Sequence, residues 1–154
     1  MQIEHELVIP VDVDTVWAMT IDVERWPSLT PTMTSVERLG GEPIGIGSQA
    51  RIVQPKQRPR VWTVTRFEPG RLFEWSAEMG TVTMTGGHHL EPVEGGTPNR
   101  LTLQLPGFRS RLLLAIAGKQ LLAAITTENE GFAAGAGARV QPGLHPGLGH
   151  GEVE

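Results

Sequence analysis

The sequence contains no cysteine and no tyrosine. Without cysteine, the chain has no disulfide framework and no thiolate ligand for a metal. No apolar run reaches the roughly 20 residues that a membrane-spanning helix needs. The first twelve residues are too charged for a secretory signal. We therefore expect a soluble, cytoplasmic protein with no membrane insertion.

Basic charge is also scarce. Lysine and arginine total 13 against 17 aspartates and glutamates, which gives a net charge of -4. The arginines are scattered and form no run that would neutralise phosphates, so no nucleic-acid partner is expected. The histidines show no ligand spacing with a carboxylate, and the glycine-rich segment 40–47 lacks the pattern of a dinucleotide or phosphate loop. We expect no metal and no cofactor.

A long amphipathic helix is the strongest feature that is present. Residues 108–132 follow Pro106-Gly107, which breaks whatever precedes them, and Gly131 lies near the expected end at Phe132. At about 100° per residue, one face carries Leu114, Ala117, Gly118, Leu121, Ile125 and Phe132. A stripe this wide is typical of a helix that lies on a large apolar surface. Glu128 interrupts the stripe.

The rest of the chain predicts an antiparallel sheet. Seven segments have strand character: 3–9, 34–39, 48–54, 61–67, 71–79, 81–91 and 99–105. Two short helices are expected between the first and second strands, one capped by Asp12 or Asp14 and one stopped by Pro27. Gly86-Gly87 predicts a bulge or a sharp bend. Because strands and helices are segregated along the chain, the fold class is α+β.

The length of 154 residues suits one domain with a hydrophobic core. We assign residues 1–133 to that domain. Residues 134–154 are rich in glycine and proline and poor in large apolar side chains. Such a composition does not offset the entropy lost on ordering, so we expect a flexible tail.

Several short motifs occur in a specific order and spacing. They are Val16-Trp17, Asp22 to Pro27, Glu68-Pro69-Gly70, His88 to Pro92 and Glu128 to Phe132. Over about residues 1–133, the sequence resembles the polyketide cyclase/dehydrase-like branch of the START/Bet v 1-like (SRPBCC) superfamily. The resemblance implies a helix-grip fold: a seven-stranded curved antiparallel sheet around a long carboxy-terminal helix, with a hydrophobic cavity between them.

Strand alternation and the helix stripe predict which side chains face that cavity. The candidate ligand-binding residues are Trp17, Trp62, Val64, Phe73, Trp75, Met84, His88, Leu103, Leu114, Leu121 and Ile125. For each of them, the alternative is that the side chain simply fills the core, since large apolar residues are usually inside.

Two residues are candidates for proton transfer. His88 shares a strand face with apolar residues, and Glu128 lies in the helix stripe, so the two are possible acid/base partners. The alternatives are a histidine hydrogen-bonded into the sheet and a solvated carboxylate, or one paired with an arginine such as Arg51. His89 should point outward and have no role.

Three functions remain open. The first is binding of a small hydrophobic ligand, polyketide-like, aromatic or lipid-like, in the cavity. The second is a polyketide cyclase or dehydratase that uses the same cavity, with His88 and Glu128 as catalytic residues. The third is a protein that acts mainly through contact with another protein, which would show a filled cavity and a large apolar outer patch. The sequence is compatible with a monomer or a homodimer.

Overall fold

The computed structural model describes the backbone of residues 1–140 and the side chains of residues 1–138. The elements in chain order are β1 Gln2–Ile9, α1 Val13–Ile21, the 3-10 helix η1 Val23–Arg25, α2 Trp26–Leu29, β2 Ser35–Leu39, β3 Gln49–Val53, β4 Arg60–Glu68, β5 Leu72–Met79, β6 Val82–Leu90, β7 Thr97–Gln104 and α3 Phe108–Val140. The α+β class and the seven strands are confirmed. No helix within residues 1–140 has the length and apolar composition needed to cross a bilayer.

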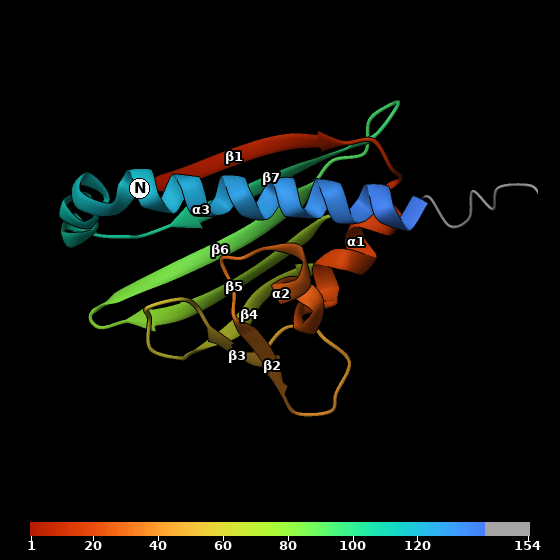
Figure 1. The fold of residues 1–154 in the computed structure, drawn as a ribbon. Helices are drawn as coiled ribbons and strands as arrows, with labels where there is room; N and C mark the ends of the chain where they lie inside the picture. Colours follow the sequence, from red (N-terminus) through yellow and green to blue (C-terminus); the bar gives the residue numbers. More distant parts are fainter. Residues whose placement is uncertain (141–154) are drawn as a thin grey trace, which may run out of the picture.

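The strands form one antiparallel sheet in the order β1-β7-β6-β5-β4-β3-β2. Consecutive strands are neighbours from β2 to β7, as their short connections predict, and β1 closes on β7 at the far edge. Figure 1 shows α3 running along one face of this curved sheet, with α1 and α2 at one end. This is the predicted helix-grip arrangement.

Of the two alternatives predicted at Gly86-Gly87, the bulge is wrong, because β6 keeps an unbroken register with both neighbours there. The register shift lies instead between Val64 and Arg66, in the β4–β5 pair. Gly87 has a different role. A Cβ at this position would lie 2.7 Å from the Thr102 hydroxyl oxygen and 2.9 Å from His89 Nε2. The missing side chain makes room for these two polar groups.

The two short helices occur where the sequence predicts them. Asp12 caps α1 and accepts a hydrogen bond from the Thr15 amide at 3.0 Å. Pro27 does not stop the second helix but lies in the first turn of α2. The reason is that a first-turn amide has no partner in the helix, so proline loses nothing there.

The long helix α3 extends to Val140, so its expected end at Phe132 was wrong. A Cβ at Gly131 would overlap the Leu29 carbonyl oxygen, and one at Gly135 would lie 2.6 Å from Leu29 Cδ2. Ala136 is fully buried. The glycine- and alanine-rich run is therefore a surface for close packing of α3 on α2, and residues 134–140 are not a flexible tail. The rest of the expected tail, residues 141–154, lies outside the described residues.

An aromatic cluster fills the end of the grip next to the short helices. Trp26 lies at its centre, with ring centroids 6.1 Å from Phe73, 5.0 Å from Trp75, 4.9 Å from His88 and 5.7 Å from Phe132. Its indole N–H donates to the Met19 carbonyl at 3.1 Å, so the one polar atom of this buried ring is satisfied. These rings pack against one another and form the hydrophobic core at this end of the sheet.

Candidate functional site

A cavity of about 340 Å³ lies between the sheet and the amino-terminal half of α3. Its volume is at the lower end of the roughly 300–1,000 Å³ typical of ligand pockets. The apolar part of its lining comes from both layers: Met33, Trp62, Met79, Met84, Leu103, Leu113, Ala117, Leu121, Ala124 and Ile125. The polar lining residues are Thr32, Gln54, Gln57, Arg60, Gln120 and Glu128. Because Gln57 and Gln120 are exposed, this polar lining includes the rim.

The structure brings five of the predicted ligand-binding residues together around this cavity. They are Trp62, Met84, Leu103, Leu121 and Ile125. The first three come from the inner face of the sheet, and Leu121 and Ile125 come from the inner face of α3. Glu128 joins them from the same stripe, one turn after Ile125.

The other predicted residues are not in the cavity lining. Val64, Phe73, Trp75 and His88 are buried in the packed core. Trp17 packs against Phe67 at a centroid distance of 5.4 Å. Leu114 packs against the core, whereas its neighbour Leu113 lines the cavity. Alternation predicts which face of a strand a side chain occupies, but not whether other side chains already fill the space in front of it.

His88 and Glu128 form a close pair. His88 Nε2 lies 3.4 Å from Glu128 Oε1, and the two side chains are 5% and 13% exposed. Arg51, the alternative partner of Glu128, instead pairs with Glu37 at 3.6 Å. The other ring nitrogen of His88, Nδ1, is buried and has no hydrogen-bond partner among the described residues.

The position of this pair defines its chemistry. Glu128 lines the cavity, whereas His88 lies behind it among the rings of Trp26, Phe73 and Phe132. A ligand therefore meets the carboxylate directly and the histidine only through it. The arrangement can hold one polar group of a ligand, or pass a proton between that group and Glu128 while His88 orients the carboxylate.

One buried polar cluster was missing from the sequence-based prediction. Asn129 is fully buried and accepts from Asn99 Nδ2 at 3.1 Å. It donates to the Asn99 carbonyl at 2.9 Å, and to His5 Nδ1 and the His5 carbonyl at 3.1 and 3.3 Å. These bonds tie α3 to β7 and β1. The spacing of Ile125, Glu128, Asn129 and Phe132 is the i, i+3, i+4, i+7 pattern of one helix face, which could have revealed it.

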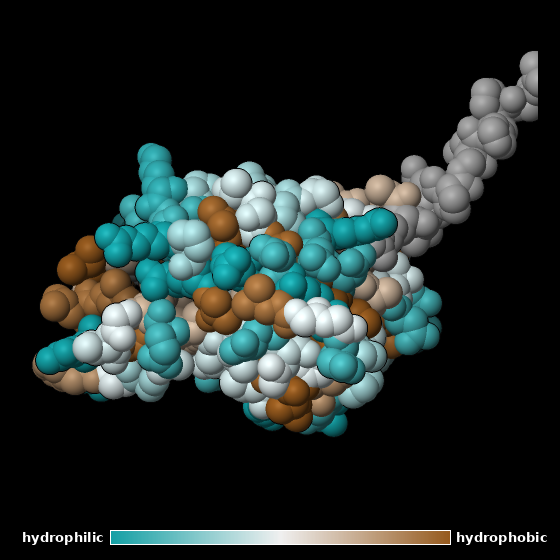
Figure 2. Space-filling model, turned by 90° about the horizontal axis from the view of Figure 1, so that it is seen from below, coloured by the Kyte–Doolittle hydropathy of each residue, from teal (hydrophilic) through white to brown (hydrophobic). Residues whose placement is uncertain are grey.

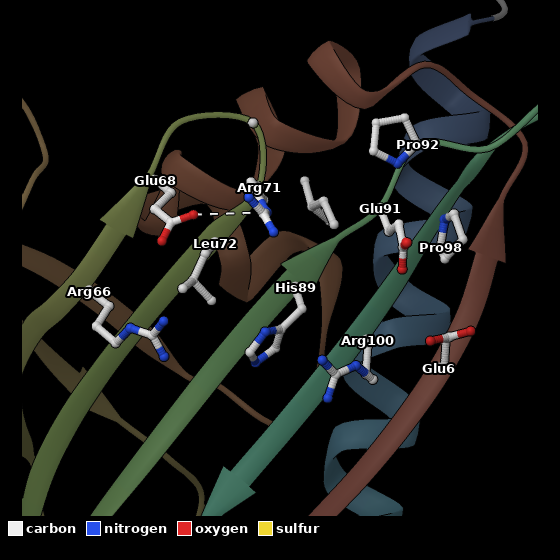
Figure 3. A pocket seen from close by; sticks show the side chains of 12 residues that line it. Glu6, Arg66, Glu68, Arg71, Leu72, His89, Glu91, Pro92, Pro98 and Arg100 are labelled. Carbon is white, nitrogen blue, oxygen red and sulfur yellow. Dashed lines mark ion pairs between the residues drawn. The ribbon is translucent and has the colours of Figure 1, made fainter.

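The opposite face of the sheet carries a larger but polar hollow of about 620 Å³ (Figure 3). His89, Arg66 and Arg100 come from β6, β4 and β7, and the ion pair of Arg71 with Glu68 lies at its edge. His89 points outward as expected but is not isolated. Burial, together with the positive charge of Arg100, lowers the pKa of this histidine.

The partners of His89 explain the arrangement around Gly87. His89 Nε2 lies 3.1 Å from the Thr102 hydroxyl and 3.7 Å from Glu74 Oε1, and Arg66 reaches Glu74 at 3.4 Å. Glu74 is buried, and the nearby Arg66 and His89 side chains compensate for the loss of water around its carboxylate. This polar surface does not suit an apolar ligand, so the cavity beneath α3 remains the candidate site.

Comparison with known proteins agrees with this geometry. The family model described as "Polyketide cyclase / dehydrase and lipid transport" matches residues 1–137. The chain belongs to this family. The predicted resemblance is confirmed, and the match extends past residue 133 into the region where α3 continues.

Among family relatives, a candidate polyketide cyclase from Streptomyces halstedii is 40% identical over 63 residues. The match covers 39% of this chain and about half, 54%, of that protein.

Solved structures share the fold. TTHA0849 from Thermus thermophilus has a TM-score of 0.73 at 18% identity, covering 92% of this chain and 100% of that one. The di-domain ARO/CYC BexL from the BE-7585A biosynthetic pathway has a TM-score of 0.72 at 20% identity. This match covers 92% of the present chain and 48% of BexL.

Proposed function

We propose that the protein binds one small, largely apolar molecule in the cavity beneath α3, with a polar group of that molecule beside Glu128. The supporting observation is the lining itself. Aliphatic, methionine and tryptophan side chains surround about 340 Å³, and one partly buried carboxylate projects from the apolar stripe. Burying apolar ligand area at roughly 25 cal/mol per Å² would drive binding. The small volume favours a compact aromatic or polyketide-like molecule over a long lipid.

The polar end of the ligand follows from the Glu128 environment. A carboxylate held at 13% exposure and backed by His88 accepts a hydrogen bond from a hydroxyl or enol of the ligand. Such a donor would offset the loss of water from Glu128 on binding, whereas an acceptor in its place would leave the carboxylate unpaired. Ligands with a phenol or enol should therefore bind more tightly than their methyl ethers.

Tryptophan fluorescence tests this proposal. A panel of small aromatic and polyketide-like compounds should contain a phenolic ligand that quenches the emission and saturates at one equivalent. In Trp62→Phe, which removes the indole that lines the cavity, at least half of that quenching should be lost because Trp62 is the only tryptophan in the lining within the described residues. Trp17→Phe is the matched control, because Trp17 packs on Phe67 outside the cavity. Equal quenching in both variants, or none in the wild type, would contradict the assignment.

A cyclase or dehydratase is the second candidate, and the 3.4 Å His88–Glu128 contact favours it. In such a reaction, Glu128 would take a proton from a carbon between two carbonyls of the substrate. The resulting enolate would form the ring bond to a further carbonyl of the same chain, and the proton would pass to the new alkoxide. The cavity would contribute by holding the two carbons together. Binding remains the first candidate because only one of the two titratable groups reaches the cavity.

Glu128→Gln separates the two candidates. It keeps the shape and removes the proton acceptor, so on a linear polyketide mimic we expect a loss of turnover of about 100-fold, with ligand affinity changed far less. His88→Asn should reduce turnover less, since His88 acts through Glu128. The rate of ring formation is followed by absorbance and mass spectrometry. If the wild type shows no turnover with any mimic that binds, the enzyme candidate is rejected and the binding proposal stands.

A further inference from the structure

The outward side of the first half of α3 carries an unusual row of large apolar side chains. Phe108, Leu112 and Ile116 occur at four-residue spacing and are 85%, 67% and 76% exposed. None of the three lines the cavity, whereas Leu113 and Leu121 of the same helix do. In Figure 2, apolar residues gather at the end of the molecule where α3 begins. We call Phe108, Leu112 and Ile116 the outer stripe.

The chain segment that contains the outer stripe carries charge of one sign. The chain carries a net charge of -4, yet residues 95–127 contain four basic residues and no acidic residue. Arg109, Arg111 and Lys119 are exposed. At about 100° per residue, Arg109 and Arg111 flank the stripe on its two sides and Lys119 continues it beyond Ile116. Arg109 also donates to the Thr81 hydroxyl at 3.2 Å, which joins this end of α3 to the β5–β6 turn.

A partner for this surface must be both apolar and negatively charged. A second copy of the chain does not meet that requirement. In a twofold pairing, the same patch faces itself, so Arg109, Arg111 and Lys119 of one copy would face those of the other, and this part of α3 contributes no carboxylate to pair with them. Self-contact through this apolar outer patch is therefore unfavourable.

We propose that the first half of α3 docks on the surface of an anionic phospholipid bilayer. Phe108, Leu112 and Ile116 enter the boundary between headgroups and acyl chains, and Arg109, Arg111 and Lys119 contact lipid phosphates. Apolar residues on one side with lysine and arginine beside them are the pattern of helices that lie in this interface. A bilayer also accepts side chains that project singly, whereas a protein partner would have to provide a matching pocket for each.

This surface adjoins the candidate ligand site. The same turns of α3 present the outer stripe to solvent and Leu113, Ala117 and Leu121 to the cavity. Docking would thus place the cavity close to the bilayer surface, where apolar molecules partition. The proposal does not depend on the identity of the ligand, because the stripe and its basic neighbours are separate from the cavity lining.

Vesicle flotation of the full chain tests the proposal. We expect binding to vesicles of phosphatidylcholine mixed with phosphatidylglycerol, weakening as salt is added, and little binding to phosphatidylcholine alone. Phe108→Gln and Ile116→Gln should each weaken binding on the order of tenfold, because each removes one buried apolar side chain. Arg111→Gln and Lys119→Gln should each weaken it about fivefold.

Matched controls come from other exposed positions. Ile46 is 73% exposed in the loop between β2 and β3, and Arg58 is exposed between β3 and β4. Ile46→Gln and Arg58→Gln should leave vesicle binding unchanged. All six positions are on the surface, so circular dichroism should show the same fold in every variant. Light scattering of the wild type and Phe108→Gln checks self-association.

Three results would overturn the proposal. The first is no binding of the wild type to the anionic vesicles, which would direct the search to an acidic protein. The second is equal loss of binding in the stripe variants and the controls. The third is a wild-type dimer that Phe108→Gln converts to a monomer, which would make the stripe a self-interface. Ligand quenching in solution stays interpretable in each case.

Discussion

Asn129→Leu is expected to lower the free energy of unfolding by about 3 kcal/mol, because the side chain makes three hydrogen bonds at roughly 1 kcal/mol each. One is accepted from Asn99, one is donated to the Asn99 carbonyl, and one is donated toward His5 and shared between its Nδ1 and its carbonyl. Asn99 is also fully buried, and its amide would lose its acceptor. Leucine offers no hydrogen bond and has a different shape. Urea denaturation followed by circular dichroism measures the change.

The adjacent residue provides the control for this variant. Glu130 is exposed on the same turn of α3, so Glu130→Leu should change stability by less than about 0.5 kcal/mol. The double variant Asn99→Leu/Asn129→Leu should be less destabilised than the sum of the two single variants, because each removes a partner of the other. Strict additivity, or a loss at Asn129 no larger than at Glu130, would show that the cluster does not hold the helix.

Gly131→Ala is expected to cost about 3 kcal/mol, the upper part of the range for overpacking. The new methyl group would overlap the carbonyl oxygen of Leu29, which is backbone and cannot move aside without shifting α2. The same substitution usually stabilises a helix, since alanine is favoured over glycine by up to about 1 kcal/mol. Tertiary packing should therefore reverse the sign of the intrinsic preference. Thermal and urea unfolding measure the effect.

Gly118 is the matched control in the same helix. A Cβ there meets no atom within 4 Å, so Gly118→Ala should raise stability by roughly 0.5–1 kcal/mol. Opposite signs at the two glycines would establish the close α2–α3 contact. A stabilising effect at both positions would mean that α3 is not seated on Leu29 as described.

These two contacts also matter for the site. Asn129 and Gly131 follow Glu128 closely in the sequence, and they attach α3 to the sheet and to α2 respectively. The carboxylate is thus positioned by a helix that is fixed on two sides. Looser attachment would move Glu128 relative to His88 and to the cavity, so variants that keep the fold but weaken these contacts should also weaken ligand binding.

The amino-acid pattern alone determined the order of elements and the fold class. Strand alternation, turn residues between consecutive strands and one long helical stripe each reflect local geometry, which depends on neighbouring residues in the chain. The family resemblance followed from motifs such as His88 to Pro92 in their order. The strand limits differ from the observed ones by at most two residues, because the turns that bound them are also local.

Only the tertiary structure decided what fills the grip and where the long helix ends. Phe73 and Trp75 face inward as alternation predicts. However, Trp26 of α2, which is far from them in the sequence, packs against both rings and fills the space in front of them. Gly131 resembles a helix end in sequence, yet it serves the contact with Leu29. Both outcomes depend on contacts between residues that are far apart in the chain. A local sequence pattern does not show how much space remains between such residues once they pack together.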